Sequence, residues 1–166
     1  AEHLARTAQA RLALVGRTPL PPRADWPALA ARGDALGQRL ARLLAIEAQG
    51  GECLALAADV TDVDAMRTVV RAARARFGAV HVAVHAAGVI DDGLLVTRTA
   101  ERTAAVIAPK ARGALVLERV LRDEPLDALV LFSSVSAQLG LDGQIDYTAA
   151  NAFLDALAEA RQARGG

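Results

Sequence analysis

The chain has 166 residues, enough for one domain with a sizeable hydrophobic core. It is 53% hydrophobic but only 3% aromatic, so we expect a core of Ala, Val and Leu. Nineteen basic and nineteen acidic residues give a net charge of +0, which argues against a nucleic-acid-binding or membrane-surface protein. No apolar run reaches the roughly 20 residues of a membrane span, and no signal peptide is recognisable. The single cysteine and the scattered histidines indicate no metal site. We expect a cytoplasmic protein.

Apolar runs and helical patterns alternate along the chain. Short apolar runs predict strands at 11–16, 52–60, 79–88 and 126–134. Apolar residues at helical spacing predict helices at 1–9, 28–51, 61–78, 97–124 and 147–164. We expect the fourth helix to be interrupted by Pro109 and Gly113.

The strand pattern indicates the fold class. The apolar runs are nearly continuous, which is typical of parallel strands that helices cover on both faces. We therefore predict an α/β protein, a Rossmann-like doubly wound parallel sheet, with residues 1–166 forming a single partial domain. The chain opens on a helix, closes on a helix and has no G-x-G-x-x-G motif. Either it binds no dinucleotide, or it lacks the first strand with its Gly-rich loop and the final strands. The abrupt beginning favours the second alternative.

Polar residues follow each predicted strand, where open α/β sheets bind their ligands. Arg17 follows the first strand, Asp59 the second, the stretch 85–93 the third, and Ser133 with Ser134 the fourth. We expect these groups to converge at one edge of the sheet.

The only tyrosine and the only lysine of the chain flank the same predicted strand. Tyr147 and Asn151 are one helical turn apart, so they share a helix face, and Ser134 could meet that face. A phenol can deliver a proton to a developing alkoxide, and a cation such as Lys110 would lower its pKa from about 10. Alternatively, Tyr147 is a helix-start aromatic residue and Lys110 a solvated charge.

Several segments together resemble the ketoreductase domains of modular polyketide synthases, in the short-chain dehydrogenase/reductase superfamily. These segments are LALVGR, AADVTD, HAAGVIDDGLL, APKARGALVLERVL and LVLFSSVSAQLGLDGQIDYTAANAFLDALA. The resemblance implies that Tyr147 is the general acid and that Ser134 polarises the same carbonyl oxygen. It also implies that Lys110 holds the nicotinamide ribose and lowers the Tyr147 pKa, while Asn151 supports Lys110 and a proton-relay water. Most of the superfamily has the lysine at the position of Asn151, and the exchange is typical of polyketide ketoreductases.

The same resemblance implies a cofactor site for NADPH. Arg17 would pair with the adenosine 2′-phosphate, which agrees with the expectation of a basic residue there for NADP. Asp59 and Val60 would contact the adenine, although Asp59 could instead cap the helix that begins near Thr61. The small-residue turn beside the adenosine ribose would consist of His85, Ala86, Ala87 and Gly88. We expect the His85 side chain to pack at the strand end.

Stereochemical and substrate features also follow from the resemblance. Ile90, Asp91 and Asp92 resemble the Leu-Asp-Asp signature of B-type ketoreductases, and Leu139 stands where the opposite class has Trp. The implied reaction is the NADPH-dependent reduction of a β-ketoacyl chain to a 3R (D) β-hydroxyacyl thioester. The chain would be carried by the phosphopantetheine of an acyl carrier protein, with neighbouring synthase domains as further partners. The alternatives are an inactive structural half-domain of a synthase and a stand-alone short-chain reductase.

Overall fold

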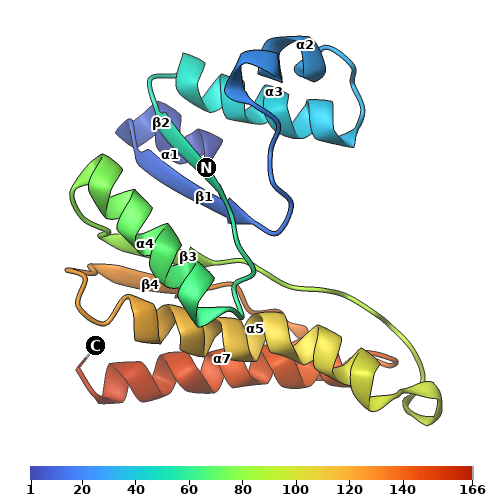
Figure 1. Ribbon diagram of the computed structural model, residues 1–166. Helices are drawn as coiled ribbons and strands as arrows, with labels where there is room; N and C mark the ends of the chain where they lie inside the picture. The colour runs from blue at the N-terminus through green and yellow to red at the C-terminus, as the bar shows by residue number, and fades with distance from the viewer. Residues whose placement is uncertain (166) are drawn as a thin grey trace. The chain divides into compact units, whose positions relative to one another are not determined.

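The computed structural model describes residues 1–165 and shows an α/β protein with parallel strands (Figure 1). It consists of two compact units. The first comprises Ala1–Ala58 with Ala75–Phe77, and the second comprises Asp59–Arg74 with the chain from Gly78 onward. The predicted Rossmann-like α/β class is confirmed, whereas the extent of the domain stays a prediction.

The first unit contains a two-stranded parallel sheet and three helices. Arg11 of β1 lies opposite Glu52 of β2, and Gly16 opposite Ala57, so the strands are in register along their full length. Its core joins Trp26, Leu40 and Leu43 to partly buried side chains of both strands. The elements are α1 (Glu2–Ala8), β1 (Arg11–Gly16), α2 (Trp26–Ala30), α3 (Ala35–Ala48) and β2 (Glu52–Ala57), with a short 3₁₀ turn at Arg23–Asp25.

The continuous helix predicted over 28–51 is wrong, because the chain breaks between α2 and α3. Gly33 has φ 72°, a left-handed conformation that a helix cannot include. Asp34 then caps α3, since its Oδ1 accepts a hydrogen bond from the Gly37 amide at 2.7 Å. The Gly-Asp pair therefore ends one helix and starts the next.

The second unit contains a second two-stranded parallel sheet. Val82 of β3 lies opposite Ala128 of β4, and His85 opposite Leu131. The helices α5 and α7 lie side by side (Figure 1), and Ala114 packs with Leu154 and Leu157 between them. The elements are α4 (Val63–Phe77), β3 (Val82–His85), α5 (Ala100–Val120), β4 (Ala128–Leu131), α6 (Ser136–Leu139) and α7 (Ile145–Ala163), with a short 3₁₀ turn at Leu95–Thr97. The last turn of α4 groups with the first unit.

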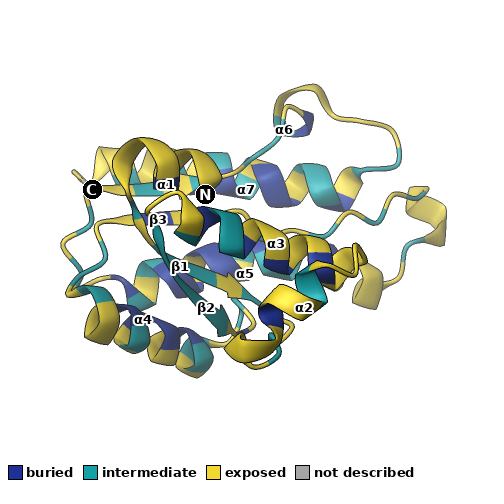
Figure 2. Ribbon diagram, turned by 90° about the horizontal axis from the view of Figure 1, so that it is seen from above, coloured by how far each residue is buried: buried dark blue, intermediate teal, exposed yellow. Residues whose placement is uncertain are grey.

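The predicted interruption of the fourth helix is also wrong, since α5 runs continuously through Pro109 and Gly113. A proline inside a helix removes one backbone hydrogen bond and costs about 3 kcal/mol. The buried residues of α5 and α7 form stripes along both helices (Figure 2), and this burial holds α5 together across the proline.

The sheet of the second unit is less covered than its apolar strands predict. Along β3, Ala83 and His85 are buried, whereas Val82 and Val84 are 53% and 51% exposed. In β4, Val130 is likewise exposed and Leu131 packs against the α5–α7 core. Within residues 1–165, therefore, one face of β3–β4 is open and the other is covered by α5 and α7.

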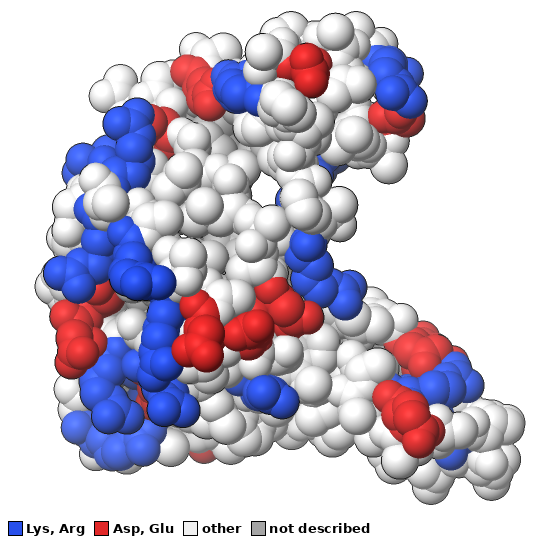
Figure 3. All heavy atoms as spheres, viewed as in Figure 1, with Lys and Arg blue, Asp and Glu red and all other residues white. Residues whose placement is uncertain are grey.

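Some of the charged side chains form ion pairs with a neighbour. Figure 3 shows basic side chains along α4 with acidic side chains beside them. Arg67 pairs with Asp64, and Arg74 pairs with Glu124. No helix within residues 1–165 is both long and apolar enough to cross a membrane.

Candidate active site

The carboxyl ends of β3 and β4 lie next to each other in the second unit. The Phe132 amide donates to the His85 carbonyl at 3.0 Å, which extends the pairing just beyond β4. The turn 86–88 and the serines after Phe132 therefore begin side by side. This is the edge at which parallel sheets bind ligands.

Lys110 reaches this edge from α5. Its side chain is buried, and its Nζ donates to the Phe132 carbonyl at 2.7 Å. The same Nζ lies 5.5 Å from the centre of the Tyr147 ring. Burial lowers the pKa of Lys110 below its usual 10.5, because the charged ammonium loses solvation. The structure thus brings the only lysine and the only tyrosine together, which excludes a solvated surface lysine.

Gly88 makes room for this lysine. A Cβ at position 88 would lie 3.1 Å from Lys110 Cε, tighter than an ordinary carbon contact. The small-residue turn therefore has a role within the chain itself: it lets the backbone approach the lysine stem.

Asn151 supports Tyr147 from one turn further along α7. It is fully buried, and its Nδ2 donates to the Tyr147 carbonyl at 2.7 Å. Its Oδ1 is also buried and has no hydrogen-bond partner within residues 1–165. A buried amide oxygen of this kind can accept from a water or a ligand.

Ser134 keeps its hydroxyl proton available. Its Oγ accepts from the Ser136 amide at 3.2 Å, so the O–H remains free to donate. Ser136 begins the short helix α6, which the sequence patterns did not predict. The neighbouring Ser133 instead donates to the Asn151 carbonyl at 3.3 Å. Of the two serines, Ser134 is the one with a proton to offer.

His85 is buried behind Lys110, at the end of β3 as expected. Its Nε2 lies 3.1 Å from the Lys110 carbonyl, and since a carbonyl can only accept, this nitrogen carries the proton. Burial lowers the pKa of His85 below 6.5, so the ring is neutral near pH 7. The side chain thereby supports the turn of α5 that carries Lys110.

The segment after β3 is anchored by charges. Asp91 accepts from Arg102 Nε and Nη2 at 2.8 and 2.6 Å, and from Arg98 Nη1 at 3.0 Å. The Arg102 hydrogen bonds are the main reason that the pKa of Asp91 falls to about 2. Asp92 accepts from Gln144 Nε2 at 3.0 Å. Ile90 is exposed, as is Leu139 at the end of α6.

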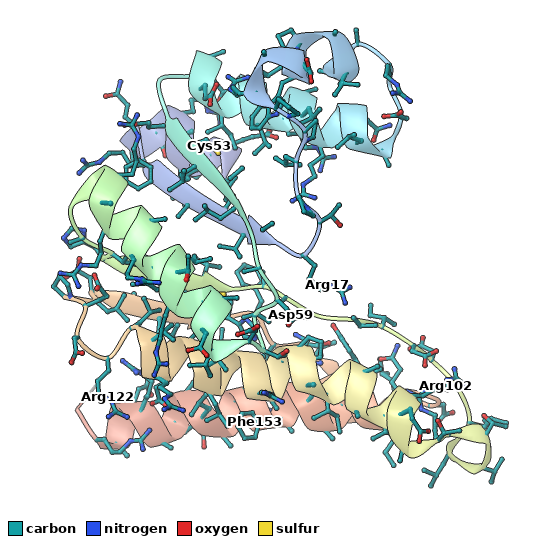
Figure 4. The ribbon with its side chains drawn as sticks, viewed as in Figure 1. Arg17, Cys53, Asp59, Arg102, Arg122 and Phe153 are labelled. Atoms are coloured by element: carbon teal, nitrogen blue, oxygen red, sulfur yellow. The ribbon has the colours of Figure 1, made fainter. Side chains whose placement is uncertain are left out.

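The residues expected at the adenosine end of a cofactor follow β1 and β2. Arg17 is exposed just after β1, and Asp59 lies just after β2 (Figure 4). Asp59 Oδ1 accepts from the Thr61 amide and hydroxyl at 2.8 and 2.7 Å. The helix cap is Asp62, which accepts from the amides of Asp64 and Ala65. Asp59 thus shapes the turn before α4 without capping it.

Sequence reasoning missed Arg98. Its guanidinium binds both Asp91 and Asp146, the residue directly before Tyr147. Because Arg98 and Asp146 are 48 positions apart, no local pattern reveals the pair.

Comparison with known protein families shows to which family the chain belongs. A family model described as "KR domain" matches residues 1–166. The chain belongs to the ketoreductase (KR) domain family. The resemblance derived from the sequence motifs is therefore confirmed.

Relatives and solved structures agree with this assignment. The KR domain is 40% identical over 167 residues to 6-methylsalicylic acid synthase of Aspergillus terreus, which covers 99% of this chain and 9% of that protein. It is 36% identical over 165 residues to 5-methyl-1-naphthoate synthase of Streptomyces sahachiroi, with the same coverage. A ketoreductase domain from the bacillaene assembly line matches with a TM-score of 0.83 and 33% identity, covering 98% of this chain and 36% of that chain.

The KR domain sequence thus spans about a tenth of the curated relatives and about a third of the solved ketoreductase chains. A short-chain dehydrogenase from Mycobacterium avium also matches, with a TM-score of 0.73 and 25% identity over 94% of this chain. Together these relationships support an oxidoreductase of the ketoreductase type with a Rossmann-like fold.

Proposed function

We propose that this KR domain reduces a β-ketoacyl thioester to a β-hydroxyacyl thioester in a polyketide synthase, with NADPH as the reductant. The observation that carries the proposal is the position of Lys110 Nζ, 5.5 Å from the Tyr147 ring centre and bonded to the backbone beside Ser134. A phenol, a cation and a free hydroxyl at one sheet edge form an acid catalyst for a carbonyl oxygen.

The residues divide the work as follows. When bound, the nicotinamide supplies a hydride to the ketone carbon. The Ser134 hydroxyl donates a hydrogen bond to the ketone oxygen, and Tyr147 transfers its phenolic proton to that oxygen. The resulting phenolate is stabilised by the Lys110 ammonium and regains a proton from solvent. Asn151 Oδ1, buried without a partner in the described chain, fits a water on that return path.

The residues present also fit a nicotinamide dinucleotide. The Lys110 ammonium has three N–H donors, and one of them donates to the Phe132 carbonyl. Two donors are left for the nicotinamide ribose and a water. The turn Ala86–Gly88 has little side-chain bulk, so a ribose can approach its backbone. The proposed adenine contacts are Asp59 and Val60. The exposed Arg17 guanidinium can pair with a 2′-phosphate, which favours NADPH over NADH.

For the substrate, we propose a chain carried by the phosphopantetheine of an acyl carrier protein, with other synthase domains as neighbours and the cytoplasm as the compartment. The Ile90–Asp92 segment and Leu139 support a B-type, 3R product. The solved structures similar to this chain include one described as A-type, at 30% identity and a TM-score of 0.77. Fold similarity therefore does not distinguish the two classes, and product analysis has to do so.

The experiment that tests this function replaces Tyr147 with Phe in the polypeptide that carries the chain. NADPH oxidation is followed with a β-ketoacyl thioester, and the product configuration is determined by chiral chromatography. We expect Tyr147→Phe to lower kcat by about 10²- to 10⁴-fold, because the ring remains and only the acid is lost.

A matched pair of serine variants adds specificity to this test. Ser134→Ala should lower kcat by about 10²- to 10³-fold, whereas Ser133→Ala should change it far less, because its hydroxyl is already bound to Asn151. An unaltered rate for Tyr147→Phe would contradict the proposed acid. An inactive wild-type protein would instead favour a structural half-domain.

A further inference from the structure

A buried guanidinium lies between two carboxylates next to the proposed acid. The Arg98 and Asp146 side chains are 5% and 6% exposed. Arg98 Nε donates to Asp146 Oδ2 at 2.6 Å, its Nη2 pairs with the same oxygen, and its Nη1 donates to Asp91 at 3.0 Å. Arg98 therefore links the segment after β3 to α7 through the protein interior.

The start of α7 depends on this link. Gln144 occupies the N-cap position but its side chain makes no capping hydrogen bond. Asp146 lies in the first turn of α7, where its negative charge interacts favourably with the helix dipole. It is held there by Arg98 and by Thr103 Oγ1, which donates to Asp146 Oδ2 at 3.2 Å. An ion pair to a distant segment thus takes the place of a local cap.

The other hydrogen bonds between the two segments do not join two charged groups. The Gly93 amide donates to the Gly143 carbonyl at 2.8 Å, and Gln144 binds the exposed Asp92. Arg102, whose side chain is 43% exposed, holds Asp91 but makes no hydrogen bond or ion pair with Asp146. Exposed ion pairs contribute little to stability, whereas a buried charge that loses its partner is strongly destabilising. Among these residues, Arg98 therefore contributes most to the position of the first turn of α7.

We propose that Arg98 is a positioning residue for Tyr147: its fork between Asp91 and Asp146 fixes the first turn of α7, and with it the phenol, relative to Lys110. The inference rests on the proposed function, because it assigns Arg98 a role through the proposed acid. Arg98 contacts neither the cofactor nor the substrate in this role. Its planar fork sets the direction of the contact, which a flexible lysine does not.

The first experiment compares Arg98→Met with Arg67→Met in the polypeptide that carries the chain. Arg67 forms an exposed Arg–Asp pair on α4, so it controls for the loss of an arginine. We expect Arg98→Met to lower kcat by about 10- to 100-fold, as a small misplacement of a catalytic group can. The KM for NADPH should remain within about twofold of wild type, because uniform binding is untouched. The kcat of Arg98→Lys should lie between that of Arg98→Met and that of wild type. The kcat of Arg67→Met should equal that of wild type.

A second experiment separates positioning from stability. The double variant Arg98→Met with Asp146→Leu removes both charges, and such replacements are often neutral for folding. We expect its melting temperature to approach that of wild type while its kcat stays reduced. Recovery of both the melting temperature and kcat would overturn the inference, because apolar packing would then be enough to position Tyr147.

A third measurement does not depend on activity. Amide hydrogen exchange at 145–149 should be faster in Arg98→Met than in Arg67→Met, because the first turn of α7 opens more often. Unchanged exchange in Arg98→Met, or a wild-type kcat, would refute the positioning role while leaving the Tyr147 result intact. An inactive wild-type protein would overturn both the function and the inference.

Discussion

Helix propensity and side-chain packing predict opposite effects for the replacement of Gly113 by alanine. It lies in α5, one turn after Lys110, and it is buried. Replacing an interior helical glycine with alanine stabilises a helix by about 1 kcal/mol when nothing else changes. Helix propensity alone would therefore predict that Gly113→Ala stabilises the domain.

The contacts predict the opposite sign. A Cβ at position 113 would lie 2.8 Å from Val60 Cγ1 and 3.1 Å from His85 Cε1. Because optimal carbon contacts are about 3.5–4.0 Å, Val60 or α5 would have to move by about 0.7 Å or more. Overpacking of this kind costs about 1–3 kcal/mol. After subtraction of the propensity gain, we expect a net loss of about 0–2 kcal/mol.

Thermal denaturation checks this expectation. Each kcal/mol corresponds to about 2–4 °C for a domain of this size. The same substitution is then made in a Val60→Ala background, which removes both Val60 methyl groups that the new Cβ would meet and leaves the His85 Cε1 contact in place. There the sign should reverse, with a gain approaching about 1 kcal/mol. If Gly113→Ala raises the melting temperature while Val60 is present, the packing of α5 described above is incorrect.

Two other predictions concern the cofactor and pH. Arg17→Ala should raise the KM for NADPH by about 10- to 100-fold, since charge-assisted hydrogen bonds contribute about 1.5–3 kcal/mol. The KM for NADH should barely change, and equal effects on both cofactors would argue against a 2′-phosphate contact. His85→Asn should reduce the loss of stability in acid. The pKa of His85 is below 6.5 in the folded chain, so below pH 6.5 the unfolded chain binds the proton first and the free energy of unfolding falls. Urea denaturation from pH 7 to 5 measures this slope, and parallel curves for wild type and variant would contradict it.

Local signals explain why much of the fold was predictable. The strand predicted at 11–16 coincides with β1, since an apolar run closed by Gly16 needs no tertiary information. The cap Asp62 and the terminal Gly78, with φ 93°, bound α4 in the same way. Pro109 was misjudged because its local cost is offset by burial of the whole helix, which a propensity argument does not include.

The main residues of the candidate site could be predicted from the sequence. The contacts that hold these residues in place could be predicted less well. Tyr147, Lys110 and Asn151 could be named because the chain offers one phenol and one ammonium and because motifs surround them. The Arg98–Asp146 pair joins segments that only the packing of α5 and α7 brings together. Both residues look like ordinary surface charges in a linear sequence. Long-range ionic contacts of this kind carry no period and no spacing rule.

The placement of the tyrosine and the lysine on different helices has a consequence for engineering. Ser134 follows β4, and Tyr147 and Asn151 lie in α7, whereas Lys110 belongs to α5. A chimera that exchanged only the segment from β4 onward would import three members of the proposed site and retain the host's lysine helix. Its phenol and ammonium would then depend on a hybrid interface between Ala114, Leu154 and Leu157. Recombination boundaries placed before α5 would keep these helices together as one inherited unit.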